Sequence, residues 1–231
     1  MMHRISQGFY WALRFFWPLV FYDLLAGAAG KIFGRDCVWL ALFGAALVAI
    51  PVLYAVWRYR QNRGRLQLPD GMVLQEEPAE DAEEEKRAGI REIFTAFAEG
   101  MALGVILNLI MAASGLAEYA GSYERAAEYM FAMPLALQLL GMCILAPLAE
   151  ELLFRGLAYT QLRETFPMWA AAVLSALYFG AAHGNIAQGI YGFLVGLCLA
   201  KSYEDKGLAG AFAMHMGANT GAVLLQFFFT A

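Results

Sequence analysis

The sequence predicts an all-α protein, a bundle of helices that crosses a membrane several times. Composition gives the first reason: 61% of the residues are hydrophobic, the mean hydropathy is +0.53 and 16% are charged. A soluble domain carries about 25% charged residues. The second reason is that the apolar residues gather in long runs, and a helix of about 20 apolar residues crosses a bilayer core. A polytopic membrane protein is therefore expected, in contact with the lipid bilayer.

About seven segments are long and apolar enough to be predicted as membrane helices. The cleanest is 38–57, which contains no charged residue. The weakest is 8–29, because Arg14, Pro18 and Asp23 interrupt it. For this segment a signal peptide and a helix lying along the membrane surface are the alternatives. The predicted segments are 8–29, 38–57, 95–116, 132–160, 168–183, 187–203 and 207–229.

Loops rich in lysine and arginine predict the orientation, because such loops stay on the cytoplasmic side. The loop after the second segment begins RYRQNRGR, which places the N-terminus in the cytoplasm and the C-terminus outside. This loop, residues 58–94, is hydrophilic and rich in glutamate, and is expected to be a disordered or partly helical linker. It separates two N-terminal helices, 1–57, from a core, 95–231. Short loops and small size are typical of a prokaryotic cytoplasmic-membrane protein.

Charged residues at membrane depth are costly, so each is a candidate for function. Glu150, Glu151 and Arg155 lie together in the fourth segment. Adjacent helical residues point about 100° apart, so the two glutamates do not share a face. Glu151 and Arg155 are four residues apart, with the acid first, and are expected to pair. Glu150 is left without a partner on its own helix, which makes it the candidate general base.

Two further patterns place polar side chains on apolar helices. Phe179 and His183 are four residues apart, as are His215 and Asn219, so each pair shares one helix face. Small residues between Phe179 and His183 allow another helix to approach closely. A single histidine in an apolar helix more often forms a hydrogen bond that joins two helices than it takes part in catalysis or ligand binding. Three polar patterns on neighbouring helices favour a site.

Depth along the helices supports the same grouping. Within the polar turn 161–167, Glu150 lies sixteen residues before Phe166 and His183 lies sixteen after Pro167, which corresponds to about 24 Å of helix each. Both are then expected near the middle of the membrane, where His215 also reaches. The turn at 184–186 would lie within the membrane, which is tolerated where backbone lines a wet cavity.

Together these patterns resemble those of the type II CAAX prenyl endopeptidase and bacteriocin-processing group, the CPBP or Abi family of intramembrane proteases. The family motifs EExxxR, FxxxH and HxxxN occur here in that order, without gap or substitution, within about 132–229. Each motif alone is weak, but the ordered set is specific. The resemblance implies that Glu150 activates the attacking water with help from His183. It also implies that His215 and Asn219 stabilise the oxyanion.

By the same resemblance, Glu151 and Arg155 orient the site. Two histidines and two glutamates could also bind zinc. The sequence has no HExxH pattern, and the resemblance implies a glutamate-activated water without metal, so no cofactor is expected and zinc is the alternative.

The expected substrate is a hydrophobic or lipidated peptide or protein, and the sequence does not identify which. Nucleic acid is not expected as a partner, because there is no basic stripe. The alternative function is a non-catalytic membrane protein, transporter-like or partner-binding, that uses the buried polar cluster to hold its helices together. Broken helices with polar groups at the midplane also occur in transporters.

Overall fold

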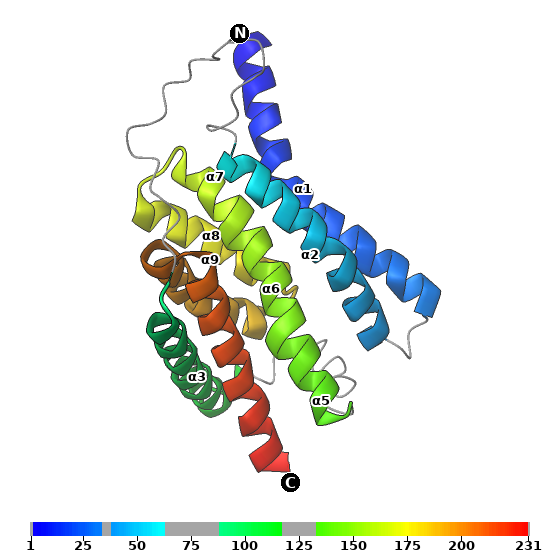
Figure 1. The fold of residues 1–231 in the computed structure, drawn as a ribbon, viewed down its shortest axis with the longest axis vertical. Coiled ribbons are helices and arrows are strands. Elements are labelled where there is room, and N and C mark those ends of the chain that lie inside the picture. Colours follow the sequence, from blue (N-terminus) through cyan, green and yellow to red (C-terminus); the bar gives the residue numbers. More distant parts are fainter. Residues whose placement is uncertain (1, 34–37, 63–87, 117–132, 231) are drawn as a thin grey trace.

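The computed structural model describes residues 2–33, 38–62, 88–116 and 133–230, and every regular element within them is a helix. The prediction of an all-α bundle is therefore confirmed. Helices α1 (Met2–Phe33) and α2 (Val38–Asn62) pack side by side along one flank (Figure 1). Helix α3 (Ile90–Ala113) lies on the other flank, against α9. Both ends of the predicted linker 58–94 are helical, because α2 extends into its start and α3 begins before its end. Its central part, 63–87, lies outside the described residues.

Helix α1 bends near its middle (Figure 1), close to Pro18. Proline has no N–H, so the carbonyl of Arg14, four residues earlier, loses its usual helical donor. The guanidinium of Arg60 from α2 donates to that carbonyl over 3.4 Å and to the carbonyl of Leu157 over 3.4 Å. Arg60 therefore joins the bend in α1 to the centre of the bundle.

The fourth predicted segment forms one continuous helical rod through the centre of the fold. Two of its stretches are π-helical, a wider form in which hydrogen bonds join residues five apart and which often occurs at functional sites. Residues 151–159 are all buried. The rod consists of α5 (Leu135–Gln138), η4 (Leu139–Leu145), α6 (Ala146–Glu151), η5 (Leu152–Tyr159) and α7 (Thr160–Arg163).

Helices α8 (Met168–Ala182) and α9 (Ile186–Thr230) form a tightly packed hairpin. Gly184 makes the turn with φ 70°, a left-handed conformation that favours glycine. Asn185 caps α9, because its Oδ1 accepts from the backbone N–H of Gln188 over 2.8 Å and its Nδ2 donates to the side chain of Gln188. At Gly207, φ 68° breaks α9 into two arms, as the sequence predicts between 203 and 207.

Close packing of α3 against the second arm of α9 depends on glycines spaced four apart on both helices. A Cβ on Gly221, for example, would lie 2.6 Å from the carbonyl oxygen of Met101. Such small-xxx-small faces let membrane helices approach backbone to backbone. Helix α3 therefore fixes the arm that carries His215 and Asn219. The four glycines are Gly100, Gly104, Gly217 and Gly221.

By length and composition, five helices in the described part of the chain qualify as membrane spans, so the prediction of about seven is not confirmed. Helix α8 has 15 residues, fewer than a bilayer requires. The two arms of α9 form one long apolar element, 186–228. The protein is nevertheless a multi-pass membrane protein by these helices. The cytoplasmic position of the N-terminus stays a prediction.

Candidate active site

An ion pair lies at the centre of the bundle, with neither side chain exposed. Nη1 of Arg155 donates to Oε1 of Glu151 over 2.9 Å, which confirms the predicted pair. Nη2 of Arg155 donates to the carbonyl of Gly196 on α9 over 3.2 Å. The guanidinium also lies 4.6 Å from the ring centroid of Phe179 on α8. The pair therefore joins the central rod to both helices of the hairpin.

The same carboxylate holds His215. Nδ1 of His215 lies 2.7 Å from Oε1 of Glu151. An ionised carboxylate only accepts hydrogen bonds, so Nδ1 is the protonated nitrogen. Nε2 of His215 faces the other glutamate, at 3.6 Å from Oε2 of Glu150, which is longer than a hydrogen bond. The two glutamates lie on different faces of their helix. Each nevertheless has a carboxylate oxygen near one of the two ring nitrogens of His215. This link between the first and third motifs was missed in the sequence.

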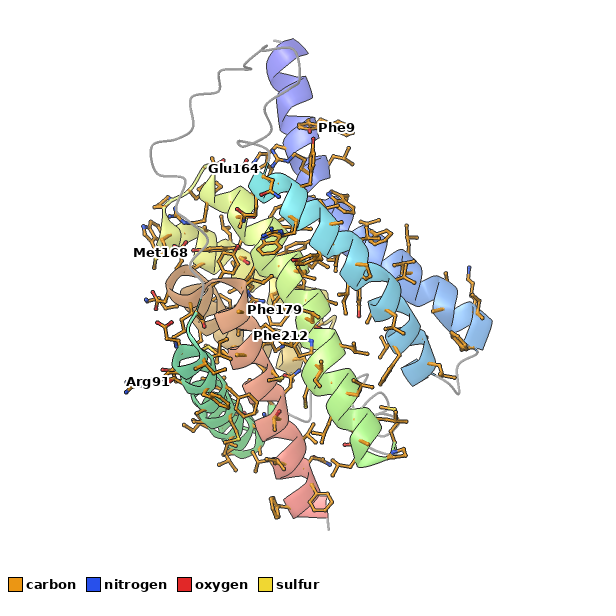
Figure 2. The ribbon with its side chains drawn as sticks, viewed as in Figure 1. Phe9, Arg91, Glu164, Met168, Phe179 and Phe212 are labelled. Carbon is orange, nitrogen blue, oxygen red and sulfur yellow. The ribbon has the colours of Figure 1, made fainter. Side chains whose placement is uncertain are left out.

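His183 is oriented by its own helix. Its Nδ1 donates to the carbonyl of Phe179 over 2.8 Å, because a carbonyl can only accept. In neutral His183 this leaves the Nε2 lone pair available. The ring of Phe179 meets both histidines edge-on, with centroids 4.9 Å from His183 and 5.6 Å from His215. Figure 2 shows Phe179 in the interior of the bundle. The ring of Phe179 therefore packs against the imidazoles of both His183 and His215.

Asn219 is anchored to the central rod. Its Nδ2 donates to the carbonyl oxygen of Met142 over 2.7 Å. In the π-helical stretch, the N–H of Ala146 bonds to the carbonyl five residues before it. The corresponding donor for Met142 would be Pro147, which has no N–H. Asn219 thus satisfies a carbonyl that the proline leaves without its helical partner, and it keeps a second N–H and its Oδ1 for other contacts.

A cavity of about 510 Å³ brings together Glu150, His183, His215 and Asn219. Glu150 keeps 26% of its side chain exposed, whereas Glu151 is fully buried behind it. The rest of the wall is largely apolar and comes from the first two helices, α3, the central rod and α9. Among the apolar wall residues are Leu42, Phe43, Ala46, Met111, Leu145 and Val195.

The cavity also contains polar residues that the sequence analysis did not single out. Asn108 of α3 donates to the carbonyl of Gly104 over 2.8 Å and lies 3.5 Å from the hydroxyl of Tyr191. As a polar residue in an apolar segment, Asn108 could have been found by the rule that selected the glutamates. Tyr22 of α1 also lines the cavity. No motif in the sequence marks it.

The side chains of the site do not form a ready zinc site. In the part of the chain that the structure describes, no three histidine, cysteine or carboxylate side chains are grouped to hold a metal ion. Oε1 of Glu151 is shared by Arg155 and His215, and Nδ1 of His215 is committed to it. A zinc ion bound at Oε1 of Glu151 would compete with both of these contacts.

Comparison with known proteins gives a family match and a similar curated protein. Residues 132–221 match the protein-family model described as "Type II CAAX prenyl endopeptidase Rce1-like". An "Uncharacterized 24.3 kDa protein" of Escherichia coli is 38% identical over 94 residues, covering 38% of this chain and 43% of that protein. No solved structure matches the chain. The family match includes all six predicted site residues but excludes α1, α2 and α3.

Proposed function

We propose that this chain, whose residues 132–221 match the model of the Rce1-like type II CAAX prenyl endopeptidase family, is an intramembrane endopeptidase that activates water with a glutamate. The observation that carries the proposal is the convergence of Glu150, His183, His215 and Asn219 on one largely apolar cavity. An apolar cavity fits a hydrophobic or lipidated peptide segment, and the four polar groups at its wall supply acid–base and hydrogen-bonding chemistry.

In the proposed reaction, Glu150 takes a proton from water while the water oxygen attacks the carbonyl carbon of the peptide bond. His183 assists, because its Nε2 is the nitrogen left free by the bond from Nδ1 to Phe179. The proton held by Glu150 then passes to the leaving amine as the carbon–nitrogen bond breaks. The products are a carboxylic acid and an amine, so the atoms of one water are fully used.

The oxyanion that forms on the carbonyl would be stabilised by Asn219 and by His215. Asn219 is held by Met142 and retains one N–H. The 2.7 Å contact between Nδ1 of His215 and Glu151 holds the imidazole in place, and Nε2 donates to the oxyanion when it carries a proton. Preorganised donors of this kind contribute strongly because they do not reorganise during the reaction. Glu151 and Arg155 are positioning residues in this scheme.

We also propose that the reaction uses no metal and that the protein lies in a prokaryotic cytoplasmic membrane. The buried Glu151–Arg155 pair supports the first point, because Oε1 of Glu151 is already engaged by Arg155 and His215.

The test is hydrolysis by the purified protein in liposomes that contain a pool of hydrophobic C-terminal peptides. In water enriched with heavy oxygen, mass spectrometry should find shorter peptides whose new carboxylate carries the label. A transporter or scaffold would produce no new peptide. Absence of any labelled product across a diverse pool would therefore contradict the proposal.

A further inference from the structure

Asp23 of α1 is an acidic residue inside an apolar segment, and the proposed reaction does not use it. The candidate span is Gly8–Phe33. Asp23 lies ten residues from its nearer end, which corresponds to about 15 Å of helix. An aspartate side chain is too short to reach the headgroups from that depth, and a carboxylate in hydrocarbon is costly. A side chain of this kind requires water or a partner at membrane depth.

A second, smaller cavity lies beside Asp23. Its volume is about 110 Å³, and its walls include Asp23, Leu19 and Ala182. Asp23 is exposed as well as being part of the wall, so the cavity reaches the protein surface there. Glu150 and His183 also line this cavity.

The two cavities share the part of the wall where the chemistry is proposed. Tyr22, Glu150, Phe179 and His183 line both of them. Glu150 therefore borders both the large apolar cavity and the small cavity. A water molecule needs about 10–15 Å³ of such volume, so the small cavity has room for several.

Hydrolysis in the large cavity requires a source of water. An apolar peptide that fills the large cavity displaces the water from it, yet each turnover consumes one water molecule. A route that reaches Glu150 without passing the peptide removes this conflict. The small cavity offers such a route, because its largely apolar wall carries the carboxylates of Asp23 and Glu150 and the imidazole of His183, which water can hydrate.

We propose that the small cavity is the inlet for the hydrolytic water, with Asp23 as its hydrated mouth. This inference rests on the proposed function, because the water serves the hydrolysis at Glu150. Its chemistry is simple: one water enters, its oxygen joins the acyl carbon and its hydrogens end on the two products. Helix α1, which lies outside the family match, thereby acquires a role in the reaction.

Accessibility to water is the direct test, and it does not require catalysis. In the full-length protein with Cys37, Cys143 and Cys198 replaced by serine, single cysteines are introduced as Asp23→Cys and Leu19→Cys. A charged, membrane-impermeant methanethiosulfonate is then added to proteoliposomes on both sides. The reagent reacts with a hydrated thiolate and not with a thiol in lipid. Leu24→Cys is the matched control, since Leu24 is 68% exposed on the same helix and belongs to neither cavity.

Labelling at 23 and 19 should be within about tenfold of that at Thr165→Cys, in the exposed turn before α8, and about a hundredfold faster than at Leu24→Cys. Ala112→Trp, which narrows the large cavity, should leave this labelling unchanged. Equal labelling at 23 and 24 would overturn the inlet, because it would mean that this part of α1 lies in water as a whole. Absence of labelling at 23 would overturn it as well.

Obstruction of the inlet is the second test. Ala182 lines the small cavity, whereas the adjacent Ala181 lines neither, and both are exposed. Ala182→Leu should lower kcat about tenfold with KM unchanged, while Ala181→Leu should behave as wild type. An equal effect of the two substitutions, or an effect of Ala182→Leu on KM alone, would overturn the proposal. If the protein cleaves nothing, the proposed function fails, and the labelling pattern still decides whether the cavity is hydrated.

Discussion

Gly180 sets the distance between α8 and α9 beside His183, and its replacement by alanine gives a calculable displacement. A Cβ at this position would lie 2.5 Å from the carbonyl oxygen of Gly189 and 3.2 Å from the backbone nitrogen of Phe193. The first distance is about 0.8 Å shorter than an ordinary carbon–oxygen contact. Both opposing atoms belong to the backbone, so a rotamer change cannot relieve the clash. The two helices must therefore separate by most of that distance.

The expected result is a folded protein with poor catalysis. Overpacking of this kind costs about 1–3 kcal/mol of stability. A displacement of about 1 Å at a catalytic group can lower the rate about a hundredfold. For Gly180→Ala we therefore expect kcat for peptide cleavage in liposomes to fall by tens of fold, with a small loss of thermal stability in detergent.

Gly189→Ala is the matched control on the opposing helix. Its Cβ would lie 3.4 Å from the carbonyl oxygen of Gly180, which is an ordinary contact. This variant should retain wild-type kcat. A Gly180→Ala protein that cleaves as fast as wild type would refute the reasoning that hairpin packing positions His183. Equal losses in both variants would refute it too.

Three further predictions concern the polar network. Glu151→Gln leaves the buried guanidinium of Arg155 without its counter-charge, so unfolding in detergent should show a loss of about 3–5 kcal/mol; a stability equal to wild type would contradict the buried pair. Asn219→Ala removes the donor to the Met142 carbonyl and one oxyanion donor, so kcat should fall about 10²–10³-fold with about 1–3 kcal/mol of stability lost; an unchanged kcat would remove Asn219 from the mechanism. Treatment with a strong zinc chelator should leave the cleavage rate unchanged, and loss of activity that zinc restores would contradict the metal-free reaction.

Much of the fold could be predicted because the hydrophobic runs determine which segments enter the membrane. Each predicted apolar segment contains or becomes a helix, and the breaks near 184 and 207 coincide with glycines at positive φ. The number of spans could not be read from the runs alone. Helix α8 is apolar enough to resemble a span but has only 15 residues, and the two arms of α9 follow one another in a single long apolar element.

Spacing and depth predicted which polar residues gather at the site, but not the contacts that join them from one helix to another. Pairing of Glu151 with Arg155 follows from spacing along one helix, and the structure confirms it. The contact from Glu151 to His215 and the anchoring of Asn219 by Met142 join residues 64 and 77 positions apart. Such contacts depend on helix packing, which spacing along one helix does not determine. The contribution of Tyr22 was invisible for the same reason, because α1 reaches the site only through tertiary packing.

In the proposed reaction, Glu150 is the general base. The most direct measurement is kcat for Glu150→Gln, which keeps the size and hydrogen-bonding capacity of the side chain but cannot accept the proton from water. Loss of a general base should lower kcat by about 10²–10⁴-fold with KM and thermal stability close to wild type. Glu164→Gln, at an exposed site in the turn before α8, should cleave as wild type. A Glu150→Gln protein that retains wild-type kcat would contradict the account.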